Sequence, residues 1–373
     1  MNKYRYDYLV VGAGLTGAVI ACELHKAGKS VLVVDKRSHI GGNCYTDTTT
    51  SIIVHQYGAH IFHTDRRWVW DYITSFGEFI WYRHEVLANY KGNTYNLPFN
   101  LNTYQQIYKD TPENSLQKLK SDIEQYQDVI PTNLEEQALK LVGRPIYETL
   151  IKGYTEKQWG KPCTELSPDI ITRLPLRDTP DNSYFNDTYQ GLPKYGYTEI
   201  IKAMLTGIQV ILNYNYTKDS SDIDAEHVIH TGMIDEYYNY CFGNLEYRSL
   251  RFEHKALPCV ELTRNAVINY TDKEVPYTRI IEHKHFNNSC CRATIITEEY
   301  PEVYEPGKEA YYPINNKNTA KLYSKYKKLA KKDDIIFCGR LGSYKYLDMD
   351  DAIVEAFKIL NKFGIKKEIL GNS

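Results

Sequence analysis

Three glycines near the start of the chain have the spacing of a phosphate-binding turn. The segment Gly12-Ala-Gly14-Leu-Thr-Gly17 follows an apolar run over 6–11 and precedes a helical pattern over 18–27. Gly12 permits a tight turn, Gly14 lets the backbone approach a pyrophosphate, and Gly17 lets the helix pack close to the strand. Unpaired N–H groups at the start of the helix bind phosphate oxygens. The motif, in this strand–turn–helix context, predicts a dinucleotide-binding site.

A second apolar run, over 30–34, ends at Asp35, 18 residues after the last glycine of the motif. An acid at this place holds the ribose hydroxyls of an adenosine, and its charge rejects a 2′-phosphate. The pair Gly41-Gly42 follows. This extension resembles FAD-binding oxidases and reductases rather than nicotinamide dehydrogenases, because paired glycines let the backbone run beside the ribityl phosphate of a flavin. An ordinary tight turn at the two glycines is the alternative.

The composition limits the class of protein. Among 373 residues, 45 Lys and Arg face 47 Asp and Glu, so the formal net charge is −2. Such a balance gives no electrostatic support for a nucleic-acid partner or an anionic membrane. With 42% hydrophobic and 25% charged residues the chain is globular rather than disordered, and its length suits two or three domains.

Metal centres and targeting segments are not indicated. The eight cysteines form no CxxC pair. His60 and His63 have a spacing that would suit a metal pair, but no third ligand follows, so we expect no metal. The N-terminus has no long apolar stretch typical of a signal peptide, and the most apolar segment, 8–24, is interrupted by glycines, which argues against a membrane span. Together with the scattered thiols, these features predict a cytoplasmic protein.

Five further segments carry longer motifs. They are GAHIFHT at 58–64, IKGYTEKQWG at 151–160, PYTRIIEHKHF at 276–286, EAYYP at 309–313 and CGRLGSYKYLDM at 338–349. Together with the glycine motif, these segments resemble the UDP-galactopyranose mutase family, in order and at family-like spacing over most of the chain.

The resemblance implies an α/β fold, with a Rossmann-like FAD-binding domain, an inserted helical bundle and an antiparallel twisted sheet. The FAD-binding domain would be discontinuous and take 1–80, 195–245 and 310–373. The helical domain would take 100–190, and the sheet domain would take 81–99 and 246–309.

Local patterns agree with this division. Apolar runs predict strands over 208–212, 227–230, 86–90 and 93–97. Thr132 and Glu135 have the spacing of a capping box at the start of a helix, whose apolar face continues toward Tyr154.

By the resemblance, the cofactor is FAD in its reduced form. Arg340 would contact the flavin, and His63 would tune its electron density. Asp348 would stand at the start of a helix whose positive end favours an anionic reduced flavin, with Asp350 as a capping residue. The predicted cofactor-binding residues are Gly12, Gly14, Thr16, Gly17, Asp35, Lys36, Gly42, Asn43, His60, Ile61, Arg340, Asp348 and Met349.

The resemblance also implies a set of substrate-binding residues. Arg173 and Arg279 would bind the diphosphate of a UDP-sugar, since a guanidinium supplies both charge and directional donors. Arg173 would also close a loop over the site. Tyr154 would stack on uracil and Tyr184 would contact the nucleotide. The other predicted substrate-binding residues are His84, Thr155, Trp159, Asn269, Tyr312 and Tyr346, and the predicted catalytic residues are Arg173, Arg279 and His63.

The family reaction is a flavin-dependent isomerisation. It interconverts UDP-galactopyranose and UDP-galactofuranose through an adduct between N5 of the reduced flavin and the sugar, and it supplies furanose for surface polysaccharide. The implied partners are a nucleotide sugar, an electron donor and a second copy of the chain in a homodimer. An amine-oxidase-like flavoenzyme and a non-catalytic FAD-dependent binding protein are the alternatives, and the paired arginines argue against the first.

Two departures from the family pattern leave the sugar open. His84 stands where we expect the family to carry Asn, and Thr188 replaces a basic residue found in some members. A related mutase that acts on UDP-N-acetylgalactosamine or on a thymidine-diphosphate 6-deoxyhexose is therefore a further alternative.

Overall fold

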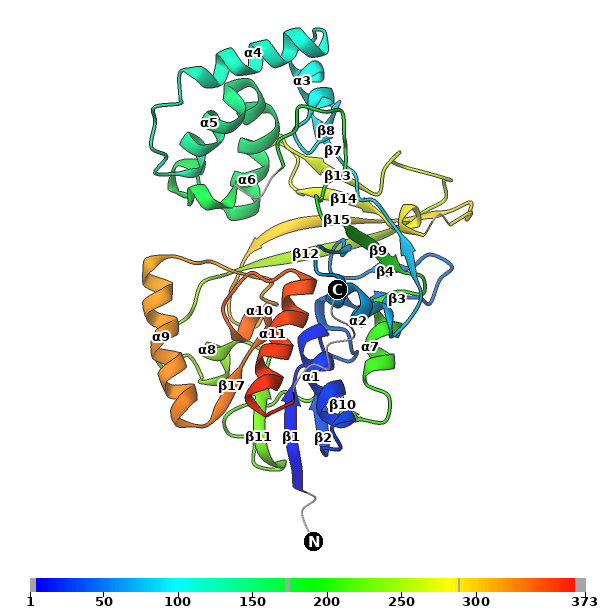
Figure 1. Ribbon diagram of the computed structural model, residues 1–373, viewed down its shortest axis with the longest axis vertical. Coiled ribbons are helices and arrows are strands. Elements are labelled where there is room, and N and C mark those ends of the chain that lie inside the picture. The colour runs from blue at the N-terminus through cyan, green and yellow to red at the C-terminus, as the bar shows by residue number, and fades with distance from the viewer. Residues whose placement is uncertain (1–4, 172–174, 288, 366–373) are drawn as a thin grey trace. The chain divides into compact units, whose positions relative to one another are not determined.

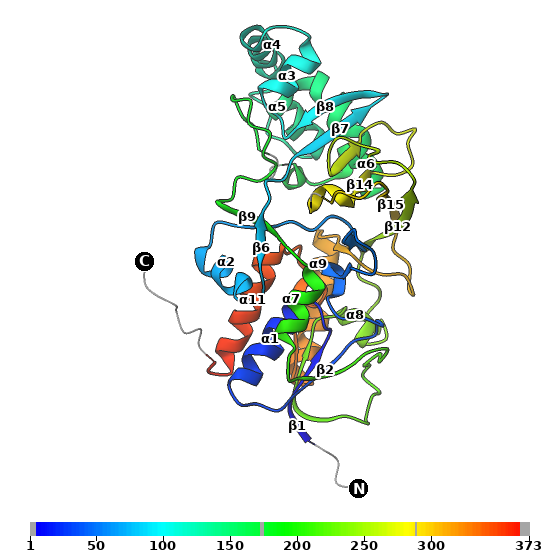
Figure 2. The same cartoon turned by 90° about the vertical axis from the view of Figure 1, so that its right-hand side faces the viewer.

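The chain packs into two compact units in the computed structural model, which describes residues 5–171, 175–287 and 289–365 (Figures 1 and 2). The first unit takes Met1–Trp81, Thr188–Ser249 and Tyr304–Ser373. The second unit takes Tyr82–Asp187 and Leu250–Val303. The chain therefore passes between the units several times, and residues far apart in sequence build each of them.

A five-stranded parallel sheet forms the centre of the first unit, in the order β10-β2-β1-β11-β17. Its strands are β1 (Arg5–Val11), β2 (Val31–Val34), β10 (Gln209–Ile211), β11 (Asp224–His230) and β17 (Ile335–Phe337). The apolar runs identified in the sequence supply β1, β2, β10 and β11, and this Rossmann-like sheet confirms the predicted fold class.

Register brings the ends of the central strands together. Val11, the last residue of β1, pairs with Val34 on one side and with His230 on the other. Because the strands are parallel, the loops that follow them leave the sheet at one edge, and this edge is where α/β sheets bind ligands.

Helices and short strands surround this sheet. The helices of the first unit are α1 (Leu15–Lys26), α2 (Arg67–Thr74), α7 (Tyr197–Met204), α8 (Ile234–Tyr237), α9 (Lys317–Lys332), α10 (Gly339–Gly342) and α11 (Met349–Lys362). Its short strands are β3 (Thr46–Asp47), β4 (Val54–His55), β5 (Phe62–Thr64), β6 (Phe79–Trp81), β9 (Tyr189–Pro193) and β16 (Tyr312–Pro313). Figure 1 shows α1 and α11 side by side against the sheet.

The second unit has a mixed sheet, whose strands follow the order β12-β15-β14-β13-β7-β8. They are β7 (Val86–Tyr90), β8 (Asn93–Leu97), β12 (Tyr247–Leu257), β13 (Val267–Tyr270), β14 (Arg279–Glu282) and β15 (Thr294–Val303). The predicted runs 86–90 and 93–97 coincide with β7 and β8. The pairs β7–β8, β13–β14 and β14–β15 are antiparallel, whereas β13 and β7 run parallel.

Four helices complete the second unit: α3 (Leu101–Tyr108), α4 (Pro112–Glu124), α5 (Leu134–Ile146) and α6 (Lys152–Trp159). The predicted helices and the predicted twisted sheet thus pack in one unit. Within the described ranges, no helix combines the length and apolarity needed to cross a bilayer.

The predicted capping box at the start of α5 is wrong by one residue. Asn133, not Thr132, is the N-cap, and its side chain accepts the N–H of Glu136 at 3.0 Å. The carboxylate of Glu136 in turn accepts the N–H of Thr132 at 2.7 Å. The helix is also not continuous toward α6, because Gly143 has a φ of 70° and a π-helical turn follows over Tyr147–Ile151.

Gly17 is where α1 packs most closely on the turn before it. A Cβ atom added at Gly17 would lie 2.0 Å from the carbonyl oxygen of Gly12, a backbone atom that cannot move aside. A Cβ added at Gly14, in the same turn, would lie 3.7 Å from its nearest neighbour, which is ordinary contact.

We therefore predict opposite outcomes for two alanine variants. Gly17→Ala should lower the free energy of unfolding by about 3 kcal/mol, or prevent folding, through overpacking. Gly14→Ala should leave it within about 0.5 kcal/mol of the parent. Urea unfolding of the protein freed of any ligand measures both, and equal stability of the two variants would contradict the close packing.

Candidate active site

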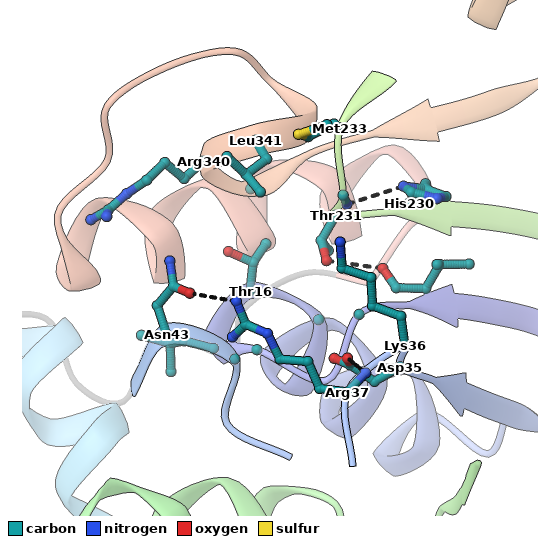
Figure 3. Close-up of a pocket in the computed structure, with 18 of the residues that line it drawn as sticks. Thr16, Asp35, Lys36, Arg37, Asn43, His230, Thr231, Met233, Arg340 and Leu341 are labelled. Carbon is teal, nitrogen blue, oxygen red and sulfur yellow. Dashed lines mark hydrogen bonds between the residues drawn. The ribbon is translucent and has the colours of Figure 1, made fainter. Parts of the chain in front are cut away.

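A cavity of about 220 Å³ opens in the first unit at the carboxyl edge of the parallel sheet. The turn after β1, the end of β2 and the end of β11 contribute to it, as Figure 3 shows. All of the predicted cofactor-binding residues except Ile61 line this cavity. Ile61 is buried beside them, and His63 on β5 does not line it.

Two glycine turns form the floor of the cavity by direct backbone contact. Gly41 donates its N–H to the carbonyl of Ala13 at 2.8 Å. Gly42 has a φ of 54°, and a Cβ there would lie 2.9 Å from the Cα of Gly14. The bare backbone, followed by the start of α1, is the arrangement that admits a pyrophosphate. The cavity therefore fits a dinucleotide.

Asp35 ties these turns to the end of β2. Its carboxylate is only 7% exposed and accepts the N–H of Ala13 at 2.7 Å and the N–H of Arg37 at 2.8 Å. A carboxylate has about four acceptor positions, so two backbone bonds leave capacity for ribose hydroxyls. Asp35 thus holds the glycine turn in place and also faces the cavity.

A cluster of charges beside Asp35 was not predicted. Arg37 lies over the ring of Tyr57, at 4.6 Å from its centroid, and donates to Glu309 at 2.8 Å. Arg37 also donates to Asn43 at 3.0 Å, as Figure 3 shows. Burial alone would raise the pKa of Glu309, but the charges of Arg37 and Lys36 lower it. The sequence shows the two basic residues after Asp35, but their acidic partner lies far along the chain.

His230 and Thr231, at the end of β11, were also missed. The hydroxyl of Thr231 donates to the carbonyl of Val11 at 2.9 Å, and a Cβ at Gly12 would lie 1.9 Å from this hydroxyl oxygen. Burial lowers the pKa of His230 to about 4, so the imidazole is neutral, and its Nδ1 accepts the N–H of Gly232 at 3.0 Å. Only the sheet order places this strand end beside the glycine turn.

At the start of α11 the two aspartates have different roles. Asp348 occupies the N-cap position but makes no capping hydrogen bond with its side chain. Asp350 is not the cap: its carboxylate accepts the hydroxyl of Thr64 at 2.9 Å and Arg66 at 2.7 Å. The suggestion that Asp350 caps the helix is therefore wrong, because the side chain instead joins α11 to the end of β5.

Three predicted residues of the first unit form one cluster of aromatic rings and a cation. The rings of Tyr312 and Tyr346 are stacked, with centroids 5.7 Å apart. The guanidinium carbon of Arg340 lies 4.8 Å from the centroid of Tyr346 and 5.8 Å from that of Tyr312. Arg340 also donates twice to the carbonyl of Leu347, at 3.1 and 2.6 Å. The cluster places two phenols beside a fixed positive charge.

In the second unit, strand register aligns three polar residues in one row. Asn269 on β13 pairs with Arg279 on β14, which pairs with Glu299 on β15. Nε of Arg279 lies 2.9 Å from a carboxylate oxygen of Glu299, a residue only 2% exposed. Oδ1 of Asn269 is buried and has no hydrogen-bond partner among the described residues. The row combines an oriented guanidinium with an unused amide acceptor.

Lys157 anchors α6 to the same strands. It was not among the site residues predicted from the sequence. Its ammonium donates to the carbonyls of Tyr270, Val275 and Tyr277 at 2.8, 2.9 and 3.0 Å. Burial lowers the pKa of Lys157 to about 8. A Cβ at Gly153 would lie 2.2 Å from a carbonyl oxygen of the same loop. These contacts fix α6, and with it the predicted residues Tyr154, Thr155 and Trp159, relative to Asn269 and Arg279.

His84 and Tyr184 lie together, as two predicted nucleotide-side residues should. Tyr184 donates its N–H to the carbonyl of His84 at 2.7 Å, and their ring centroids are 5.6 Å apart. His84 is 4% exposed and stacks on Phe185. It is a buried member of an aromatic cluster, not a surface histidine. Arg173, the other predicted arginine, lies outside the described residues.

A metal centre finds no support in the described ranges, where no group of three His, Cys, Asp or Glu residues lies close enough to hold an ion. His60 instead hydrogen-bonds the carbonyl of Gly58 through Nδ1, at 2.8 Å.

The fold and the cavity define a dinucleotide-binding α/β protein, and comparison with known proteins specifies the family. The profile of the UDP-galactopyranose mutase family matches residues 149–346, and that of NAD(P)-binding Rossmann-like domains matches 10–76. A Klebsiella pneumoniae protein described as a probable UDP-galactopyranose mutase is 40% identical over 364 residues, covering 96% of this chain and 94% of its own.

A dTDP-fucopyranose mutase of Escherichia coli is 38% identical over 371 residues, covering 96% of this chain and 97% of its own. The chain belongs to the UDP-galactopyranose mutase family, whose cofactor is FAD. A crystal structure of reduced UDP-galactopyranose mutase shares the fold, with a TM-score of 0.79 at 14% identity over 97% of this chain and 96% of that one. A putrescine oxidase shares it less closely, with a TM-score of 0.59 at 12% identity over 98% and 100%.

The anchoring by Lys157 yields a testable prediction. Lys157→Met should leave three carbonyls without their donor and lower the free energy of unfolding by about 2 kcal/mol. Lys157→Arg should recover part of this loss. Lys120→Met, which changes an exposed lysine on α4, is the matched control and should change stability by less than about 0.5 kcal/mol. Denaturant unfolding of all three variants measures these changes. Equal free energies of unfolding for Lys157→Met and Lys120→Met would contradict the anchoring role of Lys157.

Proposed function

We propose that this protein interconverts the pyranose and furanose forms of UDP-galactose, or of a close nucleotide sugar, with reduced FAD as cofactor. The observation that carries the proposal is the row formed by Asn269, Arg279 and Glu299 in a chain of this family. A half-buried guanidinium paired with a buried carboxylate, beside an unused amide acceptor, suits the diphosphate and the uridine of a nucleotide sugar.

The first unit would hold FAD through the residues that line its cavity. The turn at Gly12 and Gly14 and the start of α1 would receive the pyrophosphate, and Asp35 would accept the adenosine ribose hydroxyls. The N-terminus of α11, at Asp348 and Met349, would face the flavin with its partial positive charge. His63 would tune the flavin from β5.

When bound and reduced, the flavin supplies the nucleophile that takes the place of UDP on the anomeric carbon. The residues of this chain would hold the leaving diphosphate. Arg279 would bind it from β14, Arg173 would add a second guanidinium, and Tyr312 and Tyr346 would contribute their hydroxyls. Held in this way, UDP would recombine with the sugar faster than it escapes.

Aromatic side chains would orient the remainder of the substrate. Tyr154 would stack on the uracil, a contact of about 1 kcal/mol, and Trp159 would line the sugar pocket. Tyr184 and His84 would contact the nucleotide end. A further candidate substrate is a thymidine-diphosphate 6-deoxyhexose, which the 38% identity to the Escherichia coli dTDP-fucopyranose mutase favours.

The cellular setting belongs to the proposal as well. A cytoplasmic homodimer, reduced by a separate electron donor, would supply furanose for surface polysaccharide. A non-catalytic FAD-binding protein would bind the same ligands without turnover, and a turnover assay separates the two.

We predict that the purified protein is yellow and converts UDP-galactose only after its flavin is reduced. The reason is that an oxidised flavin lacks the electron pair needed for attack on the sugar. Chromatography of UDP-galactose and dTDP-fucose mixtures, with oxidised and reduced protein, measures the conversion and the sugar preference. Equal turnover in both redox states would exclude the proposed chemistry, and no turnover of either sugar would favour the non-catalytic alternative.

Arg279→Ala should lower kcat/KM about thirtyfold, because a charge-assisted contact contributes about 2 kcal/mol. Arg279→Lys should recover little, because an ammonium cannot replace the planar fork. Both variants should keep FAD, since the cofactor cavity lies in the other unit.

Flavin absorbance and kcat/KM together decide the outcome. Arg264→Ala, an exposed arginine of the same unit, is the control and should behave like the parent. If Arg279→Ala had the same kcat/KM as the parent, Arg279 would not be a substrate-binding residue.

A further inference from the structure

Helix α9 carries a concentrated positive charge. Its 16 residues include seven lysines and no acidic residue: Lys317, Lys321, Lys325, Lys327, Lys328, Lys331 and Lys332. Leaving these seven lysines out of the formal charge changes it from −2 to −9. The near balance of charge over the whole chain therefore hides a strong local separation.

The seven lysines share one face of the helix. At 3.6 residues per turn they fall within an arc of about 160°, and all seven are exposed. The opposite face is buried through Thr319, Tyr326 and Ala330. Apart from lysine, the exposed face carries small side chains such as Ala320 and Ser324.

No carboxylate of the described residues pairs with any of these lysines. Other exposed lysines do find partners, as Lys255 does with Glu298 at 2.7 Å. The nearest acid in sequence, Asp333, pairs instead with Lys218 at 3.2 Å, and Asp334 follows at the exposed end of the helix. Like charges one turn apart destabilise a helix, so the face is held in place against its own repulsion.

Packing and capping stabilise α9 against the mutual repulsion of its lysines. Asn316 and Thr319 form a capping box at the start of α9. On the inner side, the hydroxyl of the fully buried Tyr326 donates to the carbonyl of Gly243 at 2.7 Å. Figure 1 shows α9 along the outer edge of the first unit, beside the edge strand β17. The lysine face is thus presented on a firmly folded element.

We propose that the lysine face of α9 docks the protein on an anionic lipid bilayer. Lysine is a compact point charge on a flexible stem, which suits a surface of many mobile phosphates rather than one fixed partner. Protein interfaces rely on Trp, Tyr and Arg anchors, and this face has none. The negative remainder of the chain would be repelled by the same bilayer, which orients α9 toward it.

The proposed membrane binding depends on charge alone. The exposed face has no large apolar side chain that could insert into a bilayer, so binding is electrostatic, reversible and weakened by salt. None of the α9 residues lines the cofactor cavity. The inference is independent of the proposed reaction, because it needs neither flavin nor nucleotide sugar.

Vesicle sedimentation with the FAD-loaded protein tests the proposal. The probes are phosphatidylcholine vesicles with and without about 30% phosphatidylglycerol, at about 0.1 M and 0.5 M NaCl. The face variant is Lys321→Gln/Lys325→Gln/Lys328→Gln/Lys332→Gln. The matched control removes four exposed lysines elsewhere, as Lys29→Gln/Lys120→Gln/Lys358→Gln/Lys362→Gln.

We expect binding only to the anionic vesicles, reduced about tenfold by the higher salt and by the face variant, with the control within about twofold of the parent. Flavin absorbance and melting temperature establish that both variants are folded. Absence of binding to anionic vesicles, or equal binding by the face variant and the control, would overturn the proposal. Binding to duplex DNA or polyglutamate in place of vesicles would overturn it in favour of a polymeric partner.

Discussion

Close approach of bare backbone is the constraint on which the first unit depends. Gly17 lets α1 contact the carbonyl of Gly12, and a Cβ atom at Gly42 would come too close to the Cα of Gly14. Asp35 then fixes the turn through the N–H of Ala13. The same contacts that close the fold at this edge also expose the N–H groups of a helix start, so the packing requirement and the binding site are one feature.

In the second unit, strand register and an ion pair position the polar groups. Three strands in register align Asn269, Arg279 and Glu299, and the buried carboxylate of Glu299 orients the guanidinium. Lys157 and Gly153 then fix α6 on the adjoining loop. An isolated arginine on a strand would have many rotamers, whereas one paired with a buried acid is already oriented for a ligand. Preorganisation, rather than the number of charged residues, distinguishes this region.

Charge is separated along the molecule although the total is nearly zero. Lys36 and Arg37 both pair with Glu309 beside the cavity, whereas the lysines of α9 pair with no carboxylate among the described residues. The formal net charge of the whole chain gives no support for an anionic partner, but it does not describe how charge is distributed over the surface. A fold that gathers one sign on a single helix face can bind where the whole chain would not.

Local sequence patterns were sufficient to predict the strands and turns whose contacts lie close together along the chain. The glycine motif predicted β1, the tight turn and α1, since the required φ angles and close contacts lie within about ten residues. The same holds for β7 and β8, and all but one of the predicted cofactor-binding residues line the cavity. The three-dimensional packing was needed to show that Glu309, His230 and Thr231 complete the cavity, because their partners lie on segments distant in sequence. It also assigned Asp350 to Thr64 and Arg66 instead of to a helix cap, and it placed Lys157 over three carbonyls. Such contacts depend on strand order and helix packing, which no local pattern encodes.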